Sequence, residues 1–185
     1  MKEQIFKVTY PWDENGYKPE VVYRLNMNGE GFLMHMYIPE SNPRREETQH
    51  LKAVHLDSCA EWFVNFMPEK CDRYFNFEVN ANGVMNVAFR KDRYDLNKLS
   101  LEDIASLEIT PVIYDDHWEV SYKVPFTLIK KYIPDYCFTE GMTIRTNFYK
   151  CGEKTEYSHF GVWNPIPLEK PDFHRPEFFG EVKLV

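Results

Sequence analysis

The stretch Lys52–Phe66, KAVHLDSCAEWFVNF, alternates between two kinds of side chain. Every second residue from Leu56 onward is apolar or small, and the residues between them are mostly polar. A period of two is the pattern of a β-strand that turns one face toward a core. We therefore expect a strand over 55–66. Its outward face would carry ionisable groups from His55, Asp57 and Glu61.

The same alternation recurs along the chain. Strands are predicted over 5–10, 20–28, 31–38, 55–66, 72–80, 84–90, 108–114, 117–124, 142–150 and 179–184. Short helices are predicted at 100–106, after a Ser100–Asp103 capping pattern, and at 126–132. So many strands with so little helix predict an all-β fold, an antiparallel β-sandwich of two sheets with one or two short helices. We expect residues 1–185 to form a single domain.

The strand-pairing register of one hairpin can be predicted from the sequence. In RYFNFEVNANGVMNVAFR (73–90), a two-residue loop would set apolar side chains opposite polar ones. A three-residue loop over 81–83, with Gly83 in the left-handed conformation, pairs Phe77 with Val87 and Phe75 with Phe89. The three-residue loop is therefore predicted.

Charge and hydrophobicity exclude several classes of partner. The net charge of −7 argues against nucleic acid and anionic membranes, which need a basic surface. No segment approaches the ~20 apolar residues of a membrane span. The first residues lack the apolar centre of a signal peptide, so a cytoplasmic location is the default expectation. The oligomeric state is left open.

The four cysteines are widely spaced and form no CxxC pair, which favours free thiols over zinc and leaves disulfides open. The turn Asp115–His117 offers oxygen ligands for calcium but lacks the regular calcium-loop pattern. No residue is predicted as a metal ligand.

Six motifs in order carry a family resemblance: DSCAEWF, YFNFEVNANG, WEVSYKVPFTLI, RTNFYKCG, WNPI and FHRPEFFG. Over about residues 20–185 they resemble the family 9 carbohydrate-binding modules, and more closely their stand-alone, family 9-like branch. The resemblance implies a β-sandwich without catalytic machinery that binds a mono- or oligosaccharide, or a polysaccharide chain end, in support of carbohydrate catabolism. It implies no required cofactor, although some members hold structural calcium. Relatives are often secreted.

The resemblance also implies a ligand site. Its residues would be His55, Glu61, Arg90, Asn147 and Trp163. His55 stands where relatives commonly place a stacking Trp, and imidazole is smaller, partly polar and titratable. Trp163 fits two interpretations, a platform for a sugar ring or a plug at the end of the sandwich. Asp57 is expected to brace a neighbouring loop or the Arg90 region.

Two other functions stay open at this point. A glycoside hydrolase, or an accessory subunit acting on O-glycosyl compounds, is suggested by the abundance of carboxylates and by the enzymes to which family modules are often attached. A haem-binding sandwich is suggested by Met34, His35 and Met36 on one strand, although a buried strand explains these residues equally well. No nucleophile elbow, phosphate loop or HExxH motif is present.

Overall fold

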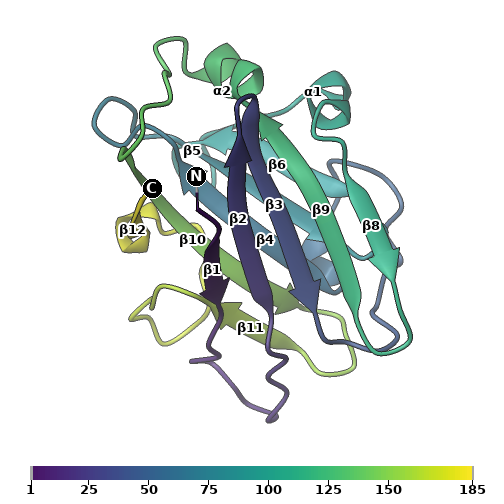
Figure 1. Cartoon of the computed structure of the whole chain (residues 1–185). Coiled ribbons are helices and arrows are strands. Elements are labelled where there is room, and N and C mark those ends of the chain that lie inside the picture. The colour runs from purple at the N-terminus through teal and green to yellow at the C-terminus, as the bar shows by residue number, and fades with distance from the viewer. Residues whose placement is uncertain (1, 185) are drawn as a thin grey trace.

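The computed structural model describes residues 2–184 and contains two antiparallel β-sheets packed face to face (Figure 1). The smaller sheet has the order β1-β2-β3-β9-β8, and the larger has the order β11-β10-β4-β5-β6-β7 with β12 also paired to β10. The strands are β1 Gln4–Lys7, β2 Val22–Asn28, β3 Gly31–Ile38, β4 Cys59–Asn65, β5 Tyr74–Asn80, β6 Met85–Arg90, β7 Leu96–Lys98, β8 Thr110–Ile113, β9 Trp118–Pro125, β10 Thr143–Gly152, β11 His159–Val162 and β12 Gly180–Lys183. The predicted antiparallel β-sandwich is confirmed.

The two predicted helices and the predicted hairpin register, which depend on short stretches of sequence, are confirmed. The helices are α1 Leu101–Ala105, with a capping box between Ser100 and Asp103, and α2 Phe126–Tyr132. The hairpin register is confirmed, because Phe77 faces Val87 and Phe75 faces Phe89. Gly83 has a φ of 75°, in the left-handed region that glycine tolerates.

The strand expected over 55–66 is shorter than predicted, and β7 and β11 were not expected. Residues Val54–Leu56 form a 3₁₀ turn, closed by a hydrogen bond from the Asp57 backbone N–H to the carbonyl of Val54. Extended pairing begins only at Cys59. Asp57 braces the neighbouring loop, as expected, since its Oδ2 accepts the Glu47 backbone N–H at 2.9 Å.

The core between the sheets is filled largely by aromatic rings. Trp62 of β4 stacks on Phe77, with ring centroids 5.6 Å apart, and lies parallel to Phe148. Every second residue of β9 from Trp118 to Val124 is buried from the opposite side. Each large apolar side chain buried in this way stabilises the fold by about 1.5–3 kcal/mol.

Gly31, at the start of β3, allows a close backbone approach. A Cβ on Gly31 would lie 2.4 Å from the carbonyl oxygen of Val124, a backbone atom that cannot turn aside. We expect Gly31→Ala to lower the free energy of unfolding, measured by urea denaturation, by about 1–3 kcal/mol. Gly29→Ala is the matched control, because nothing lies within 4 Å of its added Cβ. It should change stability by less than about 0.5 kcal/mol. Equal effects of the two substitutions would contradict the packing argument.

The face of the larger sheet that points away from the core, here called the outer face, is also covered. Residues 163–179, between β11 and β12, place Phe173 on Tyr149 with ring centroids 4.2 Å apart, and His174 on Phe63. In β4 only Asn65 escapes full burial. The outward side of β4 is therefore covered by protein and does not face solvent. The reason is that aromatic side chains at outward positions offer apolar surface on which the C-terminal segment packs.

Candidate functional site

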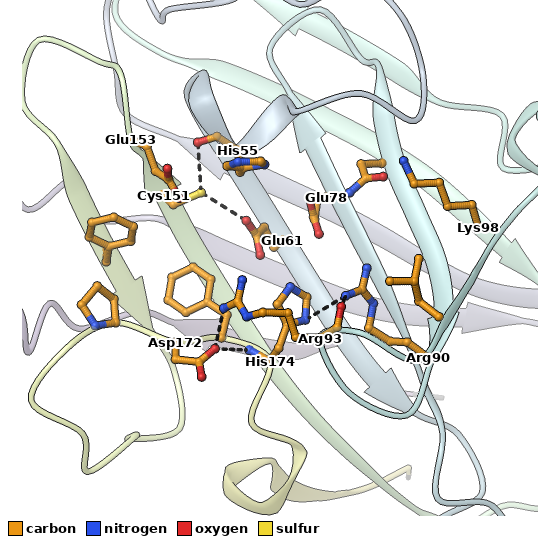
Figure 2. A pocket seen from close by; sticks show the side chains of 15 residues that line it. His55, Glu61, Glu78, Arg90, Arg93, Lys98, Cys151, Glu153, Asp172 and His174 are labelled. Carbon is orange, nitrogen blue, oxygen red and sulfur yellow. Dashed lines mark hydrogen bonds and ion pairs between the residues drawn. The ribbon is translucent and has the colours of Figure 1, made fainter.

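A pocket of about 270 Å³ lies on the outer face, between the strands and residues 171–174 (Figure 2). Side chains from the 3₁₀ turn, β4, β5, β6, β7, β10, β11 and the C-terminal segment line it. Those that are charged, titratable or able to bind metals are His55, Glu61, Glu78, Arg90, Arg93, Lys98, Cys151, Glu153, Asp172 and His174. No tryptophan lines this pocket.

Strand register builds the floor of the pocket. Glu61 of β4 lies opposite Glu78 of β5, which in turn lies opposite Asn86 of β6. The two carboxyl groups therefore stand in one row across the sheet. Glu78 is held in place, because Asn76 donates to its Oε1 at 2.8 Å and Asn86 donates to its Oε2 at 3.0 Å. Burial raises the pKa of Glu78 despite these donors.

Glu61 has one carboxyl oxygen in use and one free. Its Oε1 accepts the Cys151 thiol, with 3.1 Å between Sγ and Oε1. Within residues 2–184, no hydrogen bond reaches its Oε2. Burial, followed by the neighbouring Cys151 and Glu78, raises the pKa of Glu61 well above its usual range, which favours the neutral acid. A neutral carboxyl can both donate and accept hydrogen bonds.

Arg90 and His174 supply complementary donors. The guanidinium of Arg90 donates through Nε to Asn76 at 2.6 Å, and its Nη1 lies 3.4 Å from Nδ1 of His174. The described residues give its Nη2 no hydrogen-bond partner and place no carboxylate within 4.0 Å of the guanidinium. The Tyr74 hydroxyl also lies 3.0 Å from His174 Nδ1. Because the arginine N–H can only donate, Nδ1 is the acceptor, which assigns the ring proton to Nε2. Burial, followed by Arg90, lowers the pKa of His174 to about 3, so this imidazole is neutral.

The remaining walls come from the 3₁₀ turn and the loops. The half-buried His55 ring belongs to the middle residue of the Val54–Leu56 turn and faces the pocket beside Glu61 (Figure 2). Arg93 closes the opposite side through an ion pair with Asp172, whose Oδ1 is 2.6 Å from Nη2. The apolar lining includes Phe160 and Phe173.

Of the five residues predicted for the ligand site, three meet at this pocket and two lie elsewhere. His55, Glu61 and Arg90 line it together. Asn147 is fully buried, and its amide both accepts from the Asn164 backbone N–H and donates to the Asn164 carbonyl, so it fixes the C-terminal segment. Trp163 packs edge-on against Phe6 and Phe148 of the core, which fits the interpretation as a plug.

Sequence reasoning did not find Arg93, Asp172 or His174. The hairpin register did place Glu78 opposite Asn86. No sequence pattern indicates that residues 171–174 fold back over β4 and β5, because contacts with residues distant in sequence, such as the packing on Tyr149 and Phe63, bring them there.

The three residues considered as haem ligands lie on opposite faces of β3. Met34 and Met36 are buried in the core between the sheets. His35 points away from the core, with Nε2 3.3 Å from Glu119 Oε2. Methionine and histidine therefore do not converge on one position.

The fold and the pocket define the protein as an all-β sandwich with a pocket lined by several charged side chains on one sheet. The chain belongs to carbohydrate-binding family 9, whose family model matches residues 2–184. No match to the chain was found among the curated proteins. Along residues 2–184, every helix is too short or too polar to cross a membrane.

Three solved structures resemble this chain. A candidate carbohydrate-binding protein from Bacteroides uniformis has a TM-score of 0.85 at 29% identity, covering 100% of this chain and 86% of its own. Two structures of a family 9 module from Caldicellulosiruptor kristjanssonii have TM-scores of 0.68 and 0.66, each at 10% identity. They cover 98% and 97% of this chain and 82% and 84% of their own chains. The first holds cellotriose and the second holds glucose.

Proposed function

We propose that this protein binds a carbohydrate in the pocket that Glu61, Arg90, His174 and His55 line. The proposal rests on two hydrogen-bonding groups of the pocket wall, Oε2 of Glu61 and Nη2 of Arg90, to which residues 2–184 supply no partner. A sugar hydroxyl donates and accepts at the same time, so a pocket lined by both a carboxyl group and a guanidinium matches it. Family membership supports the same ligand class.

The size of the pocket favours a short ligand. Its volume of about 270 Å³ is near the lower limit of ~300 Å³ for small-molecule sites. We infer a monosaccharide or the end of a chain rather than a long glucan laid along the sheet. The flat surfaces available to the apolar face of a sugar are Phe160, Phe173 and the two imidazoles, in place of a tryptophan clamp.

Calorimetric titration with mono- and oligosaccharides, including glucose and cellotriose, tests the proposal. We expect Glu61→Met to weaken sugar binding about tenfold, because a hydroxyl left unpaired costs on the order of 1–3 kcal/mol. The fold should keep its stability, since methionine replaces a buried acid with an apolar chain of similar length. Glu177→Met is the matched control on an exposed residue paired with Arg175, outside the pocket. No heat from any sugar, or equal binding by both variants, would refute the proposal.

A hydrolase function receives less support from the same residues. Two carboxyl groups, Glu61 and Glu78, do stand side by side in the pocket. Retaining enzymes need one ionised carboxylate as nucleophile, and inverting enzymes need one as base. The pKa values of both groups are raised, chiefly by burial, and both oxygens of Glu78 are already bonded. We therefore propose binding without hydrolysis.

Structural calcium, which the family resemblance allows, finds little support in the ligand chemistry. At the Asp115–His117 turn, the Asp116 carboxylate is already bonded to His117 at 2.6 Å. Among the described residues, one group of three acid, thiol or imidazole ligands lies close together, and two of its members are cysteines. Calcium prefers six to eight oxygen ligands, so this group suits a different ion.

A further inference from the structure

The floor of the pocket holds two thiols that the sugar proposal does not use. Cys59 of β4 and Cys151 of β10 are direct partners in the antiparallel ladder. Both lie on the outer face, as Glu61 does, because all three occupy alternate positions of their strands. The two sulfur atoms and one carboxyl oxygen of Glu61 lie within 4.8 Å of one another. All three side chains are buried.

The cluster has no cation of its own. Along residues 2–184, no lysine, arginine or histidine forms an ion pair with Glu61, and both cysteines are free thiols. Lys150 is adjacent in sequence, but its side chain points to the inner side of β10, where it pairs with Glu40 at 3.2 Å. Three groups that each become anionic on losing a proton are thus gathered in one buried place.

We propose that Cys59, Glu61 and Cys151 bind a thiophilic divalent cation of the zinc class. Two thiolates select zinc or cadmium over calcium and magnesium, which prefer oxygen. Ligand atoms of a tetrahedral zinc site lie roughly 3.5–3.8 Å apart, so small side-chain rotations bring these three into range. The two thiols and the Glu61 carboxyl group release their protons to solvent when the ion binds.

The fourth coordination position faces the pocket. Glu61 and Cys151 line the pocket wall, so an ion between them can be reached from it and would keep a water ligand. The site uses the Glu61 oxygen that already faces Cys151, whereas the sugar contact proposed above uses Oε2. The metal inference therefore does not depend on sugar binding, and its test needs no sugar.

The missing CxxC motif argued against a zinc site built from one short segment. It does not argue against a site whose cysteines come from two different strands. Cys59 and Cys151 are 92 positions apart in the chain, and only the register of β4 against β10 makes them neighbours.

Cobalt and zinc titrations of the reduced, metal-free protein test the proposal. We expect one cobalt ion per chain with a thiolate-to-cobalt charge-transfer band, and full displacement by one equivalent of zinc. Cys151→Ser should abolish this band. Glu61→Gln should weaken cobalt binding more than about tenfold, since even changes in outer-shell partners cost 10–100-fold. Cys137→Ser removes an exposed thiol outside the cluster and should bind like the unmodified protein.

A second measurement does not depend on whether the variants fold. In the unmodified chain, zinc should slow the alkylation of Cys151 by iodoacetamide, mapped by mass spectrometry, without changing the rate at Cys137. Cobalt that gives no charge-transfer band at micromolar concentration would overturn the proposal. So would a band that survives in Cys151→Ser, or alkylation of Cys151 that zinc does not slow.

Discussion

Lys150→Met should lower the free energy of unfolding by about 3–5 kcal/mol, the usual cost of removing one partner from a buried ion pair. Lys150 is fully buried at the end of the sandwich, and its Nζ lies 3.2 Å from Glu40 Oε1. The ammonium group also donates to Ser58 Oγ at 3.1 Å and to His159 Nε2 at 2.7 Å. Methionine fills a similar volume but leaves Glu40 as a buried charge without its counterion.

Two variants make this expectation specific. Lys91→Met is the matched control, because Lys91 pairs with Asp72 at 2.8 Å while both side chains are more than half exposed. It should cost less than about 1 kcal/mol. Lys150→Met combined with Glu40→Gln should regain part of the loss, because no buried charge is left unpaired. Urea denaturation measures all four proteins. Equal losses in the two lysine variants would show that Lys150 contributes no more than a surface charge.

The second large effect is a loss of stability in acid. Burial alone would raise the pKa of Glu40, but Lys150, Ser58 and Trp118 together outweigh burial and lower it to about 2. Burial and then Lys150 lower the pKa of His159 to about 4. The structure agrees with a neutral His159, whose Nε2 accepts from Lys150 while Nδ1 lies 2.7 Å from the carbonyl of Tyr157.

The lowered pKa values of Glu40 and His159 both make the folded protein less stable in acid. A group with a lower pKa in the folded state holds fewer protons there than in the unfolded chain, so the free energy of unfolding falls as the pH falls. His159 lowers the free energy of unfolding as the pH falls from about 6.5 to 4, and Glu40 lowers it as the pH falls from about 4.5 to 2. Each shift corresponds to about 3 kcal/mol when its window is crossed completely. Because the two groups interact, the two titration steps belong to the pair as a whole.

Denaturation curves at a series of pH values check this prediction. The unmodified protein should lose several kcal/mol of unfolding free energy between pH 7 and pH 3. His159→Gln should flatten the curve above about pH 4, and Glu40→Gln should flatten it below about pH 4.5. If the three proteins respond equally to acid, other carboxylates cause the loss and this cluster does not.

Much of the fold could be predicted because strands and turns depend on local patterns. The alternation in β9 and the glycine at Gly83 each specify a conformation through neighbours in sequence. β7 escaped prediction because its three residues carry too little periodicity, and the four-residue β11 was also missed. The start of β4 was misplaced because the 3₁₀ turn at Val54–Leu56 keeps the same mixture of apolar and polar residues as a strand.

Part of the candidate site could also be predicted from the sequence, and part could not. Glu61 and Arg90 could be placed on the outward side of their strands because a strand's period fixes the face. Whether that face meets water could not be predicted, since the answer lies with residues 163–179, far away in sequence. Their packing buried Asn147 and brought His174 to the pocket.

By itself, the sequence determined the sandwich, the hairpin register and the face on which each strand residue lies, because these follow from backbone geometry and from short-range contacts. Only the tertiary structure decided which polar residues share a pocket and which thiols become neighbours. Both depend on contacts between distant segments, whose energies come from packing and burial and leave no periodic trace in the sequence.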